Sequence, residues 1–211
     1  MYVHDHLGRP LTSARMSVNG TRLHYRAEGE EETVVLLHGA PKASCHWRDV
    51  VPHLTPHYTV ITPDLRGLGD SDPAAGGFDT VTLAEDIAGR ERPFIDHWMS
   101  REAHHVDALA SDFLDEYVRC CTLPGRLRAM LFIYRATLED AEVNRAAARA
   151  PLPMPVLAVG GTYAVGDDPA RQMREVATDV REVLLDTGHH PAQEAPRETA
   201  EACLGFFAGD R

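Results

Sequence analysis

Three short loops carry the residues whose chemistry stands out, and each directly follows a predicted apolar strand. The first reads His-Gly-Ala-Pro at 38–41, the second is rich in glycine and aspartate at 63–72, and the third places His189 within 186–191. In open parallel sheets, ligands bind at the carboxyl ends of the strands, where loops of this kind lie. These loops are therefore the candidate functional segments.

The first and third loops have residue types suited to stabilising an oxyanion and to moving a proton. Gly39 lets the backbone turn sharply, so that the next N–H can face a cleft and stabilise negative charge on a substrate oxygen. His189 lies on a tight turn after Gly188, and an imidazole that titrates near neutral pH suits a general base. An ordinary strand-to-helix turn explains 38–41 equally well, whereas the position of His189 at a strand end favours function.

The second loop favours a structural interpretation. Its glycines, including Gly67 and Gly69, permit a tight loop. We expect Asp64 and Arg66 to pair and to hold that loop in place.

The first third of the chain predicts a hairpin followed by buried strands. Polar and apolar residues alternate around Asn19-Gly20, which predicts strands at Met16–Val18 and Leu23–Tyr25. The apolar, β-branched runs Thr33–Leu37 and Tyr58–Thr62 predict strands buried on both faces, as in a parallel sheet.

A helical block separates two regions of alternating strands and helices. Residues 92–149 show no strand pattern, and their apolar residues recur at helical spacing, which predicts about three helices. The other predicted elements are helices at Trp47–Leu54, Thr80–Gly89, Asp168–Ala177 and Pro196–Phe207 and strands at Pro155–Gly160 and Val180–Leu185. This order predicts one α/β fold divided into residues 1–89, the N-terminal half of the core, 90–150, a helical cap, and 151–211, the C-terminal half.

Composition excludes several classes of partner and cofactor. The chain has 211 residues, with 21 Lys and Arg against 32 Asp and Glu, and its net charge of −11 opposes binding to nucleic acid or to an anionic membrane. No apolar stretch approaches the roughly 18 residues of a membrane span, and no signal peptide is expected. Four cysteines without a disulfide framework predict a reducing cytoplasm. No motif predicts a cofactor or a metal.

Taken in order, the three loops resemble the α/β-hydrolase fold and, more narrowly, its epoxide hydrolase and haloalkane dehalogenase branch. The run 38–41 resembles the oxyanion loop of that branch, and 64–72 is similar to the glycine-rich loop that follows it. The turn at 188–189 matches the turn of the catalytic histidine. Residues 89–94 resemble a cap segment of bacterial epoxide hydrolases, and 126–160 resemble the end of such a cap and the next strand.

The resemblance implies a mechanism and a set of roles. In this branch an Asp on a sharp turn after strand five opens the epoxide and forms an ester, which a histidine-activated water then hydrolyses. An acid orients the histidine, and cap tyrosines hydrogen-bond the epoxide oxygen. By resemblance, Ala40 supplies an oxyanion N–H and His189 is the base. The catalytic candidates are His189, Asp167, Asp168 and Tyr134, and the oxyanion and substrate-binding candidates are His38, Gly39, Ala40, Pro41 and Trp47.

Two of these assignments have structural alternatives. Tyr134 lies on an apolar helical stripe, so a role in the core fits it at least as well. Asp167 and Asp168 follow several residues after the strand that ends at Gly160, where some members of the family place the acid. Asp168-Pro169 can instead begin a helix.

The turn that carries the nucleophile has no counterpart in the sequence. It requires a nucleophile flanked at two-residue spacing by small residues after a strand, and the branch has Gly-His-Asp-x-Gly-Gly there. Here the predicted helix at Thr80–Gly89 runs directly into the cap-like segment 90–94. The fold class predicted is therefore an α/β-hydrolase-like, mostly parallel sheet with a helical cap insertion that lacks the equivalents of central strands five and six.

No other residue is a convincing substitute for the nucleophile. Thr162 has the required glycine and alanine spacing, but it follows a strand after which the family has a loop. Cys45 lies on the first helical turn after the oxyanion loop with no evident base, and Ser71 lies in a loop with a structural character.

The missing strands have a structural consequence. Without them, the runs 33–37 and 155–160 must pair directly or leave apolar edges open, and open edges promote aggregation or strand exchange between chains. Besides a small apolar substrate, a second copy of the chain is therefore an expected partner.

Three functions remain open at this point. The first is an epoxide-hydrolase-like enzyme whose activity is impaired or lost. The second is a non-catalytic protein that binds a small molecule. The third is the product of an in-frame internal deletion, joined at Gly89 and Arg90, with no function of its own.

Overall fold

The computed structural model describes residues 3–18, 21–72, 91–133, 143, 145–146, 148 and 150–209. The chain forms two compact units, the first made of Met1–Met99 and Ala110–Arg135 and the second of Ser100–Leu109 and Ala136–Arg211. The predicted turn at Asn19-Gly20, the predicted helix Thr80–Gly89, the join at 89–90 and Tyr134 lie outside the described residues. The predicted division at residues 89 and 150 stays a prediction.

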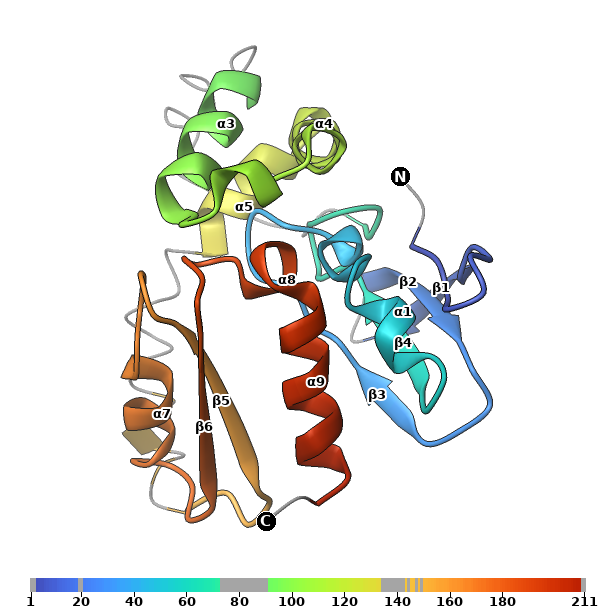
Figure 1. Cartoon of the computed structure of the whole chain (residues 1–211). Helices are drawn as coiled ribbons and strands as arrows, with labels where there is room; N and C mark the ends of the chain where they lie inside the picture. The colour runs from blue at the N-terminus through green and yellow to red at the C-terminus, as the bar shows by residue number, and fades with distance from the viewer. Residues whose placement is uncertain are drawn as a thin grey trace. The chain divides into compact units, whose positions relative to one another are not determined.

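A four-stranded sheet forms the centre of the first unit (Figure 1). The strands β1 (Thr12–Val18) and β2 (Thr21–Glu28) pair antiparallel, which confirms the predicted hairpin. The strand β4 (Thr59–Pro63) pairs antiparallel with β2 and parallel with β3 (Thr33–Val35), so the order is β1-β2-β4-β3.

The prediction that Thr33–Leu37 is buried on both faces is wrong. Only Thr33–Val35 forms a strand, and the side chains of Val35 and Leu37 are 52% and 59% exposed. The Leu36 N–H donates to the Ile61 carbonyl at 2.9 Å and continues the pairing with β4. Successive side chains of a strand point to opposite faces, so Val35 and Leu37 share the exposed face and Leu36 is buried on the other. Within the described residues, β3 is the last strand of its sheet.

The helix predicted at Trp47–Leu54 is divided into two short pieces. A 3-10 helix, η1 (Ser44–Trp47), is followed by a turn and by α1 (Val51–Leu54). Pro52 in the first turn of α1 has no N–H to donate, so the helix does not extend continuously back through it.

The predicted helical block is confirmed over its described residues. It contains α3 (Glu91–Glu102), the 3-10 helix η2 (Val106–Ala108), α4 (Ser111–Thr122) and α5 (Arg126–Ile133). Helical spacing places the buried side chains of α4 on one stripe. The largest fully buried side chains of the first unit include Tyr117, Phe113, Leu54, Ile95, Met99 and Met130.

In the second unit, a parallel strand pair lies between two helices (Figure 1). The strands β5 (Val156–Gly161) and β6 (Val180–Leu185) pair with each other, α7 (Asp168–Met173) packs on one side and α9 (Pro196–Phe207) on the other. The predictions for β5, β6 and α9 are confirmed. The helix α7 is shorter than predicted because residues 174–176 form a turn, after which Ala177 makes a bridge to Leu152.

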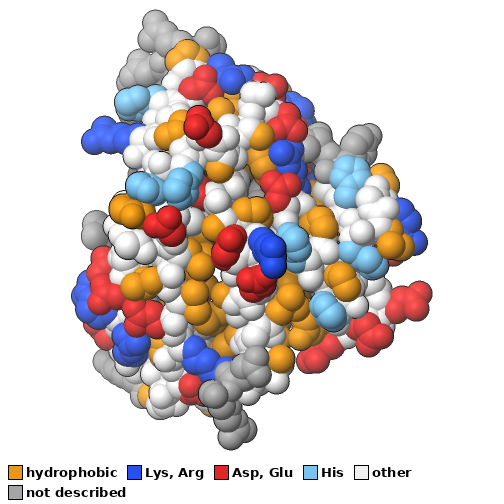
Figure 2. Space-filling model, viewed as in Figure 1, with side chains coloured by type: hydrophobic (Ala, Val, Ile, Leu, Met, Phe, Trp, Pro, Cys, Tyr) orange, Lys and Arg blue, Asp and Glu red, His pale blue; other side chains and the backbone are white. Residues whose placement is uncertain are grey.

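The strands β3 and β5 belong to different units and to separate sheets. On the face drawn in Figure 2, acidic and basic side chains are interspersed rather than gathered by sign. None of the described helices has the length and apolar character needed to cross a membrane.

Candidate active site

In the first unit, His38 holds the candidate oxyanion loop in place. Its Nδ1 lies 2.9 Å from the Gly39 carbonyl, and its Nε2 lies 3.1 Å from the backbone N of Leu65. A backbone N–H can only donate, so Nε2 accepts and the proton lies on Nδ1. Burial lowers the pKa of His38, and the Gly39 hydrogen bond and the nearby Asp64 charge only partly oppose that shift. His38 is therefore a neutral structural residue, not a base.

The loop that His38 holds is tightly closed. The N–H of Lys42 donates to the Gly39 carbonyl at 3.0 Å, Ala40 is half-buried, and Pro41 is buried after a cis peptide bond. Trp47 ends η1, and its indole Nε1 is buried without a hydrogen-bond partner among the described residues. The backbone N–H of Ala40 remains the candidate oxyanion donor of this loop.

Asp64 joins the glycine-rich loop to two other segments. Its carboxylate lies 2.7 Å from His24 Nδ1, 2.6 Å from the backbone N of Ser44 and 3.0 Å from that of Asp70. Burial alone would raise the pKa of Asp64, but these hydrogen bonds lower it to about 2. The predicted pairing of Asp64 with Arg66 stays a prediction, and partners distant in sequence bind both carboxylate oxygens.

Ser71 and Gly69 complete this structural cluster. The buried Ser71 hydroxyl donates to the Asp64 carbonyl at 2.6 Å and accepts the His24 N–H at 2.8 Å. Gly69 has a φ of +53°, and a Cβ there would lie 2.2 Å from Asp64 Cγ. Ser71 is therefore committed to holding the loop, which agrees with its structural interpretation.

Cys45 is a poor nucleophile where it lies. Its side chain is 1% exposed, and burial, together with the nearby carboxylates of Glu116 and Asp64, raises its pKa to about 12. The thiol consequently stays protonated at neutral pH, and the thiolate is the reactive form.

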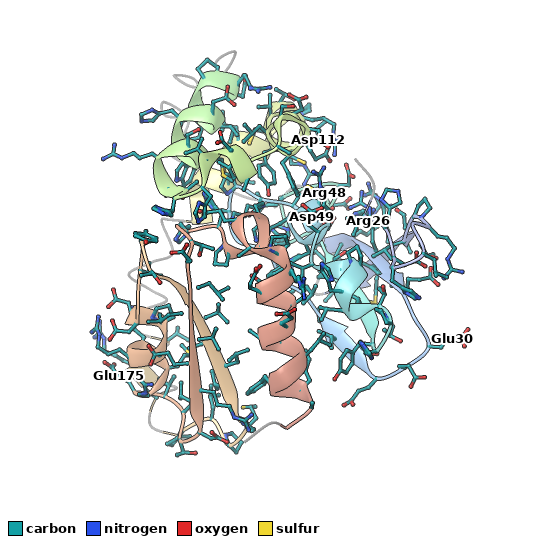
Figure 3. All side chains as sticks on the ribbon, viewed as in Figure 1. Arg26, Glu30, Arg48, Asp49, Asp112 and Glu175 are labelled. Atoms are coloured by element: carbon teal, nitrogen blue, oxygen red, sulfur yellow. The ribbon has the colours of Figure 1, made fainter. Side chains whose placement is uncertain are left out.

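The helix α4 is fastened to the segment after the oxyanion loop, a feature that sequence patterns did not indicate. The Arg48 guanidinium lies 3.7 Å from the centre of the Phe113 ring and pairs with Asp112 at 2.5 Å (Figure 3). The buried Tyr117 hydroxyl lies 3.4 Å from His46 Nδ1. These contacts hold the second helix of the helical block against η1, which follows the candidate loop.

In the second unit, His189 is exposed on its predicted turn. Its backbone N–H donates to the Glu102 carbonyl at 2.8 Å, and its ring stands edge-on to that of His190 at 5.5 Å between centres. Within the described part of the chain, no carboxylate hydrogen-bonds the His189 ring. The general-base role of His189 stays a prediction.

Asp168 shares a cavity with His189 without contacting it. The cavity has a volume of about 440 Å³ and is lined chiefly by apolar residues of β5 and α7. Asp168 is the first residue of α7, as its alternative interpretation proposed, and its carboxylate pairs with Arg171. Among the described residues, neither Asp167 nor Asp168 pairs with His189, so the orienting acid also stays a prediction.

Thr162 is tied to the end of β6. Its hydroxyl and its N–H both lie 2.9 Å from the Leu185 carbonyl. The hydroxyl is therefore a donor to backbone rather than a group presented on a nucleophile turn.

Comparison with known proteins identifies the fold. Residues 32–93 match the family model described as alpha/beta hydrolase fold. Cfl2 from Burkholderia cenocepacia has 27% identity and a TM-score of 0.84, with 92% of this chain and 95% of Cfl2 covered. The epoxide hydrolase CorEH has 25% identity and a TM-score of 0.78, with 95% and 100% covered. The chain therefore has the α/β-hydrolase fold, and its described residues form fewer strands than a complete one.

Sequence relatives narrow this class. The soluble epoxide hydrolase of Corynebacterium sp. (strain C12) is 28% identical over 281 aligned positions, which cover 94% of this chain and 98% of that enzyme. A haloalkane dehalogenase of Sphingobium indicum is 37% identical over 71 residues, 33% of this chain and 24% of that enzyme. The chain is thus an α/β-hydrolase-fold protein whose relatives include epoxide hydrolases and haloalkane dehalogenases.

The alignment with the Corynebacterium enzyme also reveals a difference in length. It runs over 281 positions, whereas this chain has 211 residues, so at least 70 aligned positions of that enzyme have no counterpart here.

Proposed function

We propose that this chain is an epoxide-hydrolase-like α/β-hydrolase that takes a small apolar epoxide or a related substrate and turns it over slowly or not at all. The observation that carries this proposal is the Corynebacterium alignment, which covers 94% of the chain while leaving at least 70 positions of the relative without a counterpart. The lack of a nucleophile pattern between Thr80 and Phe94 supports a loss within that stretch.

In the proposed chemistry His189 is the base, Asp167 or Asp168 is the orienting acid, Ala40 is the oxyanion donor and Tyr134 is the cap tyrosine. Without an Asp nucleophile, His189 can only take a proton from a water whose oxygen bonds to an epoxide carbon while the ring C–O bond breaks. The released oxygen takes a proton from the Tyr134 hydroxyl, and His189 returns its proton to that tyrosine, which gives the diol. This route lacks the ester intermediate, which divides one difficult step into two easier ones. Slow turnover follows from that loss.

The test is hydrolysis of aryl and alkyl epoxides by the purified chain, with His189→Ala and the exposed His57→Ala as a matched pair. We expect little or no diol from the wild-type chain, and any diol formed is expected to disappear in His189→Ala alone. Turnover comparable to that of an ordinary family member, lost in His189→Ala, would overturn the proposed impairment.

A non-catalytic binding protein is the second candidate, and the cavity beside His189 favours it. The volume of about 440 Å³ falls within the range of small-molecule sites, roughly 300–1,000 Å³, and its lining is mostly apolar. A melting temperature that rises with epoxide concentration, without turnover, would support this function.

The third candidate is a deletion product without a selected function, which the abrupt join at Gly89 and Arg90 favours. It predicts aggregation without a cooperative melt. A genomic sequence that carries an intact nucleophile turn between codons 89 and 90 would establish this history.

Two further parts of the proposal concern partner and compartment. The exposed edge residues Val35 and Leu37 support self-association through open sheet edges. All four cysteines are free thiols, which supports a reducing cytoplasm as the compartment.

A further inference from the structure

The Glu194 carboxylate gathers backbone N–H groups from two segments of the second unit. Its Oε2 lies 2.8 Å from the backbone N of His104, 2.8 Å from that of His105 and 2.9 Å from that of Gly188. Its Oε1 lies 3.1 Å from the backbone N of His190. Burial alone would raise the pKa of Glu194, but these four hydrogen bonds lower it. The group is therefore ionised at neutral pH, and its hydrogen bonds are of the stronger, charge-assisted kind.

Local structure explains how the carboxylate reaches this position. Glu194 is the last residue of the short helix α8 (Pro191–Glu194), and its own N–H donates to the His190 carbonyl at 2.9 Å. Helical side chains point toward the N-terminus of their helix, so the Glu194 side chain lies close to the residues that precede α8.

Every backbone N–H of the histidine turn is held from outside the turn. Those of Gly188 and His190 donate to Glu194, and that of His189 donates to the Glu102 carbonyl. The segment 102–105 packs directly on the turn, because a Cβ on Gly188 would lie 2.3 Å from the Glu102 carbonyl oxygen.

We infer that Glu194 is a positioning residue for His189, which fixes its turn and couples that turn to segment 102–105 of the helical block. The role rests on the proposed function of His189 as the base. Glu194 acts through the backbone on both sides of His189, so the direction of the imidazole depends on a carboxylate that does not touch it.

The test is Glu194→Gln, with Glu198→Gln as the control because Glu198 is exposed on the neighbouring helix α9. The Gln oxygen can replace Oε2, but its NH₂ group then faces the His190 N–H, and both are donors. By NMR we expect amide exchange at Gly188, His190, His104 and His105 to be about tenfold faster or more, since local opening sets exchange protection. The ring of His189 is expected to change its chemical shifts, because the backbone on both sides of the residue is no longer held.

A carboxylate that only stabilises the fold would lower the melting temperature without changing the chemical shifts of the His189 ring. The inference is overturned if Glu194→Gln leaves these ring shifts where Glu198→Gln leaves them. Should Glu194→Gln fail to fold, the wild-type chain still tests the hydrogen bonds of Glu194. The four amides that donate to Glu194 must be protected from hydrogen exchange at neutral pH in the wild type. Exchange at the rate of an unstructured peptide would refute the hydrogen bonds.

These readouts do not depend on epoxide turnover. A wild-type chain that turns epoxides over like an ordinary family member, and in which Glu194→Gln changes the His189 ring shifts, would contradict the proposed impairment alone. A wild-type chain with little or no turnover, in which the His189 ring shifts are unaffected by Glu194→Gln, would contradict the role of Glu194 alone.

Discussion

Replacing Asp64 by Asn tests whether one buried carboxylate holds the glycine-rich loop to β2 and to the first residue of η1. Asp64 Oδ2 accepts hydrogen bonds from His24 Nδ1 and the Asp70 N–H, and Oδ1 accepts the Ser44 N–H. An Asn that keeps its oxygen at the Oδ2 position turns its NH₂ group toward the Ser44 N–H. The substitution therefore places two hydrogen-bond donors, the Asn NH₂ group and the Ser44 N–H, against each other at the first residue of η1.

The magnitude follows from the pKa of Asp64. Hydrogen bonds to the charged form hold it at about 2 against an ordinary 3.8. At 1.36 kcal/mol per unit, the ionised form stabilises the fold by about 2.5 kcal/mol. An unsatisfied buried donor costs about 1–3 kcal/mol and overlaps partly with that loss, so we expect Asp64→Asn to lower the free energy of unfolding by about 2–4 kcal/mol.

Urea unfolding followed by tryptophan fluorescence measures the free energy of unfolding of the first unit, which contains Asp64. The only two tryptophans of the sequence, Trp47 and Trp98, both belong to the first unit. The control is Asp72→Asn, in the same loop, because Asp72 pairs with Arg15 and Arg22 at the surface. Exposed ion pairs contribute about 0–1 kcal/mol, so the control is expected to change stability little.

The same variant has a predicted dependence on pH. The folded-state pKa of Asp64 lies below its unfolded value, so its stabilisation is fully present above about pH 4 and is lost as pH falls toward 2. The difference in unfolding free energy between wild type and Asp64→Asn should therefore shrink over that interval. A cost of Asp64→Asn equal to that of Asp72→Asn at pH 7, or a difference that stays constant down to pH 2, would refute the reasoning.

Two further predictions concern a glycine and a sheet edge. Gly69→Ala is expected to destabilise the first unit by several kcal/mol more than Gly125→Ala, and urea unfolding measures the difference. Both glycines have a positive φ, but an added Cβ overlaps the Asp64 side chain at Gly69 and meets open space at Gly125. By light scattering, the wild-type chain is expected to self-associate as its concentration rises. Val35→Lys on the edge strand β3 is expected to weaken this self-association more than Met16→Lys on β1, the strand at the opposite edge of the sheet. A wild-type chain that stays monomeric would contradict the prediction.

Local patterns were sufficient for most elements of the second unit. The bounds of β6 and α9 were predicted correctly, because their apolar periodicity and, for α9, the proline at its first position act within a few residues. The hairpin at β1 and β2 followed from alternation around Asn19-Gly20 for the same reason. The likeness to α/β-hydrolases followed from loops whose spacing is itself a local feature.

Patterns were insufficient wherever a partner lies far away in the chain. Arg66 is two residues from Asp64 and was the predicted partner, whereas His24, 40 residues away, takes the carboxylate. Glu194 was missed although it stands four residues after His190, because nothing in that spacing reveals the N–H groups of His104 and His105. Only the meeting of these segments gives the carboxylate its four donors.

The sequence by itself therefore determined the α/β class of the chain, the loops that carry its candidate chemistry and the lack of a nucleophile pattern. The tertiary structure decided which backbone groups His38 and Ser71 bind, that Val35 is exposed on the last strand of its sheet and that Glu194 accepts the N–H groups on both sides of His189. The physical reason is that periodicity indicates which face of a strand or helix is apolar. What covers that face, and which donors reach a buried carboxylate, depends on segments brought together only by folding.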